Sequence, residues 1–584
     1  MDPAAELELR LDDFANESPD FHSDKIDFIQ SIYTGDHGIA KFRFGAKLVI
    51  ALKDRSKGKS VSVYPLADVK CKKDTGEVLK ETVFKNLAAG INKVEHGRVK
   101  FVQNDEGKWK CTIIDKDDVH FNASTTIDAV AFMIGDLKFL SMILGKENFD
   151  GQWCYLCKLF YSEWQKGDVC GIPWTLKDLI AQAEKSKHSN GKEIMGVREI
   201  PFFDIPVMRY IWPILHTLIG IGNAIMKNLI DIVESEIQVV PTREIRLRRE
   251  VRELAAEIME LMMEKEYWMS KEEGTGSALL SEYKKERNKL IRKMDALDED
   301  DNVEYTDEYA DCHTNLLEYQ EAIVALEKEK LEMAAKLKSK REQKSKKSKI
   351  IEDCKKGRKT DSDSLYTAID KILQDYGILR AAYHGGDLTG GCVKKLMANA
   401  EIIMERVEVL LIENKDNECT LDNAQIHTLC NNSAQVLSLW DGALAEMHTN
   451  YPLEENCRKT QQYIDKAMKV SREMEMSVIV KEHGTEKHIV SQMRNTRGGL
   501  FEFDESWGEQ YHQVGHSFDV RLSNQGCELR KGIVRAGENR RVTHPKTQLA
   551  LKKVVEKKRG KRPATLAKEA DVKKMKTERR SKYL

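Results

Sequence analysis

The sequence lacks a signal peptide and lacks an uncharged apolar run long enough to span a membrane. Its first 24 residues are rich in acids, whereas a signal peptide begins with basic residues followed by an apolar stretch. The most apolar window, residues 205–226, contains Arg209, His216 and two prolines. We therefore predict a buried helix in this window and no membrane partner.

The sequence also has little that indicates a disulfide framework or a nucleotide site. Its twelve cysteines are mostly isolated, and one C-x-x-C is formed by Cys154 and Cys157. In a large chain without a signal peptide, this pattern favours a metal site or free thiols. A Gly-rich turn at residues 382–397 lacks the Gly-Lys-Ser/Thr ending of a phosphate loop, so we expect no nucleotide cofactor.

Charge is unevenly distributed along the 584 residues, although the net charge is -1. From Lys546 to Leu584 there are fifteen Lys/Arg and four Asp/Glu. This basic tail predicts phosphate contacts or a nuclear import signal, and a merely solubilising tail is the alternative. Its basic clusters have no interleaved aromatic residues, so they do not indicate base-specific contacts.

The N-terminal part has the alternating apolar patterns of β-strands. The predicted elements are a hairpin (26–36 and 41–54), a third strand (61–71), a helix (74–94) capped by Asp74 or Thr75, and short strands (108–115 and 118–121). Residues 126–136 then form a continuous apolar run that ends on Asp136, as a buried central strand does. This order fits a ribonuclease-H-like α/β sheet, in which acids lie at adjacent strand ends.

Residues 242–358 are almost wholly charged and helical in pattern. Apolar residues follow a coiled-coil-like 4-3-4-3 spacing at Leu247, Val251, Leu254, Ile258 and Leu261. The stretches EEGTGS and DALDEDDN divide the segment into three helices. This pattern favours antiparallel helical hairpins that pack on themselves, and a dimeric coiled coil is the alternative.

Three acids are candidate ligands of catalytic metal ions: Asp36, Asp136 and Glu509. Phosphoryl transfer in DNA uses two divalent ions about 4 Å apart, and Mg²⁺ prefers carboxylate oxygens. A carboxylate that ends an apolar strand is costly unless it is paired or metal-bound, which favours Asp136. The alternatives are a helix cap at Asp136, a turn residue at Asp36, and a third acid at Glu502, Asp504 or Glu505.

Two pairs of residues predict a zinc site. Cys154 and Cys157 form one half, and His483 and His488, five residues apart, form the other. The C-x-x-C begins 18 residues after Asp136, and the second histidine is 21 residues before Glu509. The alternatives are two buried thiols, or a site closed by Cys170 and His188.

Two zinc half-sites around a long helical segment, with acids in the order Asp, Asp, Glu, resemble a DDE-type DNA transposase. The similarity is to the Transib transposases and the related vertebrate recombination-activating recombinase, over roughly residues 30–515. The segments that carry it are TGDHGIAKFRFGAKLVIAL, GDLKFLSMILGKENFDGQWCYLC, LHTLIGIGNA and HGTEKHIVSQMRNTRGGLFEFDESWGEQYH.

The resemblance implies a ribonuclease-H-like core interrupted by a large, mostly helical insertion. Asp36, Asp136 and Glu509 would bind two Mg²⁺ or Mn²⁺ ions, and the four Cys and His residues would bind one structural Zn²⁺. Two features depart from the group. Only 35 residues precede Asp36, which leaves no room for the domain that binds transposon ends in this group, and the helices at 243–350 have no counterpart.

The resulting organisation has seven expected regions. They are a disordered acidic N-terminus (1–24), the first part of the ribonuclease-H-like core (25–150), a zinc half-site with buried helices (151–240), charged coiled-coil-like helices (241–360), a helical insertion (361–480), a histidine half-site with the last catalytic acid (481–545), and a disordered basic tail (546–584).

The predicted function is metal-dependent DNA strand cleavage and strand transfer by a nuclear transposase or transposase-derived protein. Its expected partners are DNA, as transposon ends and as target, and a second copy of the chain. The alternative is a non-catalytic, zinc-stabilised coiled-coil nuclear protein that binds DNA or protein. A metal-dependent nuclease of similar fold without strand transfer is a third hypothesis.

Overall fold

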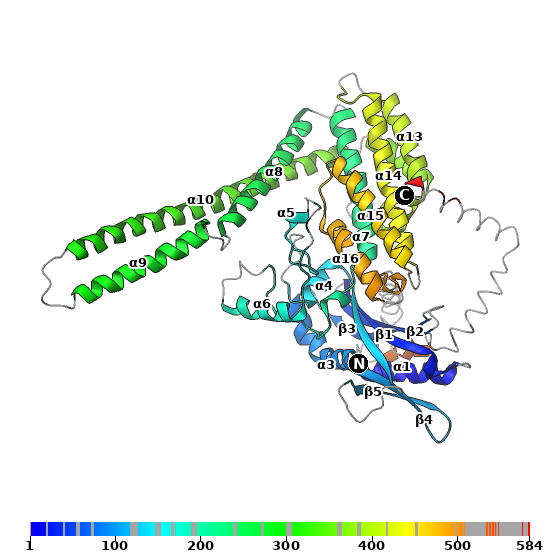
Figure 1. Cartoon of the computed structure of the whole chain (residues 1–584). Coiled ribbons are helices and arrows are strands. Elements are labelled where there is room, and N and C mark those ends of the chain that lie inside the picture. Colours follow the sequence, from blue (N-terminus) through cyan, green and yellow to red (C-terminus); the bar gives the residue numbers. More distant parts are fainter. Residues whose placement is uncertain are drawn as a thin grey trace. The chain divides into compact units, whose positions relative to one another are not determined.

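The chain forms two compact units in the computed structural model. We name them the core unit (Met1–Ile230, Asp370–Ile412 and Asp422–Leu584) and the arm unit (Asp231–Ile369 and Glu413–Leu421). Apart from a few single positions, the structure describes residues 2–18, 21–38, 41–53, 59–71, 75–116, 126–146, 153–164, 171–188, 195–237, 242–269, 274–298, 307–358, 365–381, 387–415, 419–449, 454–496 and 499–505. The fold is mixed α/β (Figure 1).

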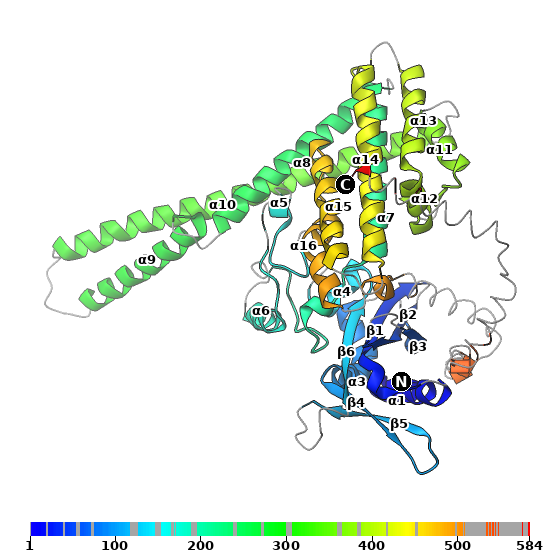
Figure 2. The same cartoon turned by 45° about the vertical axis from the view of Figure 1, so that its right-hand side comes forward.

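A six-stranded sheet in the order β3-β2-β1-β6-β4-β5 lies in the core unit (Figure 2). Its strands are β1 (Ile26–Gly38), β2 (Lys41–Leu52), β3 (Lys59–Lys70), β4 (Gly97–Gln103), β5 (Trp109–Asp115) and β6 (Thr126–Ile134). β6 pairs in parallel with β1, and the other pairings are antiparallel. The predicted hairpin and buried strand are therefore confirmed, whereas β4 was not predicted and residues 118–121 lie outside the described residues.

The predicted helix after β3 is present but irregular. It comprises α2 (Gly76–Leu79), a π-helical turn (Lys80–Phe84) and α3 (Lys85–Glu95). Of the two residues predicted to cap the helix, Thr75 is the N-cap, because its side chain accepts a 3.4 Å hydrogen bond from the Val78 N–H. Leu87, Ile91 and Val94 of α3 are buried, since their spacing places them on one face of the helix.

The acidic N-terminus, which we predicted to be disordered, forms helix α1 (Pro3–Glu17). Its apolar residues at four-residue spacing, Leu7, Leu11 and Ala15, are buried. Its polar residues accept hydrogen bonds from the N–H groups of edge strand β5: Ile113 to Glu8 Oε1 (2.7 Å), Cys111 to Asp12 Oδ1 (2.6 Å) and Trp109 to Asn16 Oδ1 (2.8 Å). The prediction failed because the partners of these acids lie about 100 residues away in sequence.

Helices make up most of the rest of the core unit. They include α4 (Leu137–Ile143), α5 (Tyr161–Trp164), α6 (Leu176–His188), α7 (Ile214–Ile232), α12 (Gly390–Ala398), α13 (Ala400–Glu413), α14 (Asn423–Met447), α15 (Glu454–Glu473) and α16 (Val480–Asn495). The apolar window predicted to be a buried helix contains most of α7, whose inner face is buried. Among the described residues, no helix combines the length and apolar character needed to cross a membrane.

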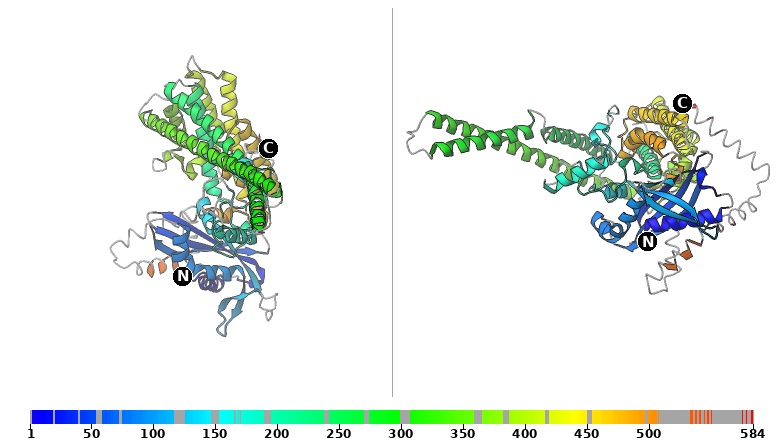
Figure 3. Two further views of the ribbon diagram at one scale, coloured as in Figure 1. Left: turned by 90° about the vertical axis from the view of Figure 1, so that its left-hand side faces the viewer. Right: turned by 60° about the horizontal axis from the view of Figure 1, so that its bottom comes forward.

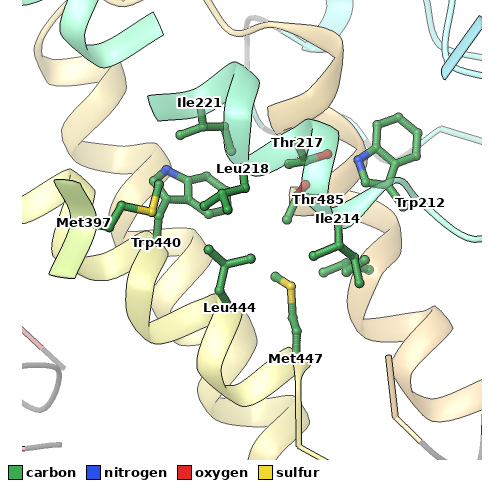
Figure 4. Close-up of a pocket in the computed structure, with 11 residues that line it drawn as sticks. Trp212, Ile214, Thr217, Leu218, Ile221, Met397, Trp440, Leu444, Met447 and Thr485 are labelled. Carbon is green, nitrogen blue, oxygen red and sulfur yellow. The ribbon is translucent and has the colours of Figure 1, made fainter. Parts of the chain in front are cut away.

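A small apolar cavity of about 10 Å³ lies where α7, α12, α14 and α16 meet (Figure 4). Its lining includes Leu218 of α7, Met397 of α12, Trp440 of α14 and Thr485 of α16. The cavity is the size of about one water molecule, so these helices are closely packed. This packing fixes α16, which carries two of the predicted metal ligands.

The arm unit contains α8 (Thr242–Met269), α9 (Gly276–Asp298) and α10 (Asp307–Arg358), separated at the two predicted breaks (Figures 2 and 3). α8 lies antiparallel to α10, with Lys340 paired to Glu257 and Lys347 to Glu250. α9 lies along the other half of α10, where Lys284 pairs with Glu327 at 2.7 Å. The helices therefore pack on one another within the chain, as predicted.

One face of α10, named here the seam, contacts both α8 and α9. Its positions follow a continuous 4-3 spacing: Cys312, Leu316, Tyr319, Ile323, Leu326, Lys330, Met333, Leu337, Lys340, Lys344, Lys347 and Ile351. All are buried or half-buried except Lys330, whose ammonium lies 5.6 Å from the centre of the Trp268 ring. This 3.5-residue period is typical of coiled-coil packing.

Candidate metal centres

The four predicted zinc ligands meet at one buried point. The ligand atoms of Cys154, Cys157, His483 and His488 all lie within 4.8 Å of one another. Cys154 Sγ is 3.3 Å from His488 Nε2, and Cys157 Sγ is 3.4 Å from His483 Nε2. Ligands at about 2.1–2.3 Å from a tetrahedral zinc are separated by about 3.5 Å. The donor set and spacing therefore fit one Zn²⁺.

The cysteine half of this cluster lies on a tight loop. The Leu156 N–H points at Cys154 Sγ (3.4 Å), and the Cys154 N–H donates to the Leu159 carbonyl (3.4 Å). Gly171 lies directly against Cys157, because a Cβ at this position would be 2.6 Å from the Cys157 sulfur. The loop is therefore shaped around the two thiols, and Cys170, the rival ligand, lies outside the described residues.

The histidine half lies on α16 and is held by aromatic rings. Trp164 stacks on His483 with ring centroids 4.8 Å apart. Gly484 gives Trp212 room to lie against α16, since a Cβ there would be 1.9 Å from the Trp212 ring. Trp212 in turn stacks on Tyr155 of the cysteine loop at 5.0 Å. These contacts fix the imidazoles and link the two halves.

The electrostatics of the cluster favour a metal-binding thiolate. Burial acts against ionisation of Cys154, but the hydrogen bond from Cys157 and the charge of His488 outweigh it and lower the pKa of the Cys154 thiol. The buried Lys146 ammonium donates to the Cys154 carbonyl at 2.7 Å. Burial lowers the pKa of Lys146 to about 8, although the two neighbouring sulfurs oppose this shift.

Asp36 and Asp136 lie at the same level of two neighbouring strands. β1 and β6 pair in parallel with Thr34 opposite Ile134, and each acid follows two residues later. Adjacent strands are about 4.8 Å apart. Burial is the main cause that raises the pKa of Asp136, and the charge of Asp36 adds to this increase.

A glycine precedes each of these acids, and both glycines contact the ring of Phe139. A Cβ at Gly35 would be 2.9 Å from this ring, and a Cβ at Gly135 would be 2.7 Å from it. Gly135 also has a φ of 149°, which side chains disfavour. The two Gly-Asp dipeptides therefore allow Phe139 to pack closely against the backbone before both acids, and this repeated dipeptide is visible in the sequence.

Asp136 also caps a helix, as our alternative interpretation proposed. Its Oδ1 accepts a 2.6 Å hydrogen bond from the Phe139 N–H at the start of α4. Burial raises the pKa of Asp136, while this hydrogen bond and the charge of His216 act to lower it. Capping engages one carboxylate oxygen, so it is compatible with metal binding by the other.

Glu505, one of the competing third acids, is buried and shares two charged neighbours with Asp136. Its Oε2 accepts a 2.9 Å hydrogen bond from the Leu215 N–H, and its Oε1 lies 3.5 Å from His216 Nδ1. The charges of Asp136 and Glu505 both act on His216 and on Lys481. Lys481 is half-buried over Gly220 of α7, where a Cβ would be 3.0 Å from its ammonium. These residues form one charged cluster.

The other candidate acids in this region have different partners. Glu502 pairs with Lys47 at 2.5 Å, and Asp504 pairs with His448 at 3.0 Å. Glu509, the predicted third acid, lies outside the described residues. Within the described part of the chain, Glu505 is the third-acid candidate that shares neighbours with Asp136.

No protein-family model matches the chain, and no curated protein is significantly similar to it.

Proposed function

We propose that this chain is a DDE-type transposase, or derives from one, and that it cleaves and joins DNA strands on a ribonuclease-H-like core. One observation carries the proposal. Asp36 and Asp136 each lie two residues beyond the last parallel pairing of β1 with β6, and each follows a glycine that lies against Phe139. Carboxylates that follow neighbouring parallel strands in this way are suited to bind a pair of divalent ions.

Glu505 is the third carboxylate that the geometry favours. It is buried, it is fixed by the Leu215 N–H, and it shares His216 with Asp136. An ionised buried acid needs compensating charge, which His216 supplies in part. Glu509 remains the sequence-based prediction for this role, and the experiment below separates the two.

Two Mg²⁺ or Mn²⁺ ions, when bound, would supply activation of the attacking oxygen and stabilisation of the leaving oxygen. The protein would contribute position and charge. Asp36 and Asp136 would hold the metal-binding edge of the sheet, and His216 would orient Glu505 through its ring nitrogen. Lys481 would place a positive charge beside the acids, where a DNA phosphate would bind.

The zinc cluster would support this centre rather than take part in the chemistry. Its four ligands are protein side chains, which is typical of a closed structural site. It would join the loop that follows α4 to α16, and α16 precedes Glu505 by ten residues. Zinc would thereby fix the third acid relative to the sheet. DNA is then the partner, with the nucleus as the proposed location.

The test is a strand-cleavage assay on supercoiled DNA with Mg²⁺ or Mn²⁺. We expect Asp136→Asn and Glu505→Gln each to lower cleavage by at least about 100-fold, which corresponds to about 3 kcal/mol of transition-state stabilisation. Glu509→Gln is the matched comparison, and loss there alone would restore the sequence-based assignment. No cleavage by the unmutated, zinc-loaded protein would favour the non-catalytic binding protein.

A further inference from the structure

Charge is segregated along α10 of the arm unit. Residues 307–332 contain eight acidic and two basic residues, whereas residues 333–358 contain eleven basic and three acidic residues. At 52 residues the helix is about 78 Å long. The two halves therefore extend well beyond the screening length of about 8 Å, and the basic half is a separate electrostatic surface.

The lysines of the basic half form an inner and an outer set. The inner lysines Lys340 and Lys347 lie on the seam and pair with Glu257 and Glu250 of α8. The outer set is exposed, and none of its members has an ion pair within the part of the chain that the structure describes. It comprises Lys336, Lys338, Lys346 and Lys349. The inner set serves the packing of the arm, so the outer set is the one that can meet a partner.

A groove of about 380 Å³ between α8 and α10 adjoins these lysines. Three cationic residues line it, namely Lys265 of α8 with Lys338 and Arg341 of α10, against one acid, Glu342. The groove therefore adds a concave, positively charged surface next to the outer set of lysines.

The apolar residues of α10 indicate what kind of partner fits the basic half. Leu317, Val324 and Leu331 are exposed in the acidic half. In the basic half, Ile350 is the one large apolar side chain exposed among the described residues, and residues 333–358 contain no aromatic residue. Protein interfaces have an apolar and aromatic centre, whereas binding to a nucleic-acid backbone is dominated by cationic side chains and needs no apolar centre. The basic half of α10 therefore has the properties of a surface that binds a nucleic-acid backbone.

We propose that the basic half of α10, with its groove, binds the phosphate backbone of duplex DNA without reading the bases. Lys338 and Lys349 are eleven residues apart, which is about three helical turns, so they lie on one face of α10 about 16 Å apart, a distance that matches about five base pairs. This surface is separate from the acid cluster and does not depend on it.

The test compares two variants of the full-length, zinc-loaded chain. The arm variant carries Lys336→Gln, Lys338→Gln, Lys346→Gln and Lys349→Gln, which preserve helix propensity. The control variant replaces four exposed lysines of the core unit, Lys85, Lys93, Lys177 and Lys185, by Gln. Binding of a 30-base-pair duplex is followed by fluorescence anisotropy between 50 and 200 mM salt, without magnesium or manganese.

Each phosphate contact contributes about 0.9 to the slope of log affinity against log salt. We expect the magnitude of this slope to fall by about 3 to 4 in the arm variant, and by the same amount for duplexes of unrelated sequence. In the control variant it should fall by less than 1. An unchanged slope, or equal losses in both variants, would overturn the proposal. A changed oligomeric mass with unchanged DNA affinity would instead assign the surface to a second copy. The binding assay contains no magnesium or manganese and measures no cleavage, which separates its outcome from failure of the proposed catalytic function.

Discussion

Gly35 and Gly135 lie against the same side chain, the ring of Phe139. Each is followed by an acid, Asp36 and Asp136, at the end of the parallel pair β1 and β6. Phe139 is also the residue whose N–H donates a hydrogen bond to the capping Asp136 carboxylate. One aromatic residue therefore contacts the backbone before both acids and orients one carboxylate, so the acid pair depends on the packing of Phe139.

Gly135→Ala should disturb both stability and the acid pair. A methyl group would lie 2.7 Å from Phe139, at a φ of 149° that alanine disfavours. We expect the free energy of unfolding, measured by urea titration, to fall by about 1–3 kcal/mol, and DNA cleavage to fall with zinc retained. Gly107→Ala is the control, because its φ is 75° but no atom lies within 4 Å of the new methyl. Equal effects of the two changes would contradict the role of Phe139.

Cys154→Ser should remove the zinc. Serine is a poor substitute for the thiolate, which lies 3.3 Å from His488. We expect metal analysis to show close to one zinc in the unmutated chain and almost none in the variant, with the melting temperature lowered by at least about 5 °C. Cys430→Ser, also at a buried cysteine, should keep its zinc. A variant that lost no zinc would refute the ligand set.

The sequence predicted the metal ligands and several strands correctly but missed helix α1 and did not favour Glu505, and each outcome has a physical reason. The Cys and His ligands were identified because their chemistry is evident from residue type, whatever their separation. Strands β1, β2 and β6 were identified from local apolar patterns. Helix α1 was missed, because Glu8 and Asp12 are satisfied by the backbone of β5. Glu505 was not preferred, because its burial beside His216 depends on how α7 packs and not on the sequence around it.

The pair of His216 and Glu505 should make stability depend on pH. Burial acts to lower the pKa of His216, but the hydrogen bond and charge of Glu505 outweigh it and raise the pKa above 6.5. The folded state then holds this proton more tightly than the unfolded state, so the stabilisation is complete below pH 6.5 and is lost as pH rises through the raised value. Urea titration without added magnesium or manganese should show His216→Gln to be less stable than the unmutated chain at pH 5.5. The difference should shrink by pH 8.5, and a constant difference would contradict the pairing.

Asp12→Ala should weaken the covered edge of the sheet. The change leaves the Cys111 N–H without its 2.6 Å acceptor beneath α1, and an unsatisfied buried donor costs about 1–3 kcal/mol. We expect that loss in the free energy of unfolding, together with faster hydrogen exchange at Cys111. Asp105→Ala, at an exposed turn residue between β4 and β5, should leave both unchanged. Unchanged slow exchange at Cys111 in the Asp12 variant would show that the Asp12 carboxylate is not what protects this N–H.

The most direct test of the central claim is metal rescue of Asp136→Cys in the DNA-cleavage assay. A thiolate is a poor ligand for Mg²⁺ but a better one for softer ions such as Mn²⁺. If Asp136 binds the catalytic metal, cleavage by this variant should be lost in Mg²⁺ and restored at least about tenfold in Mn²⁺, while Asp136→Asn stays inactive in both. Undiminished cleavage by Asp136→Cys in Mg²⁺, or equal loss in both metals for the two variants, would contradict a metal-binding role for Asp136.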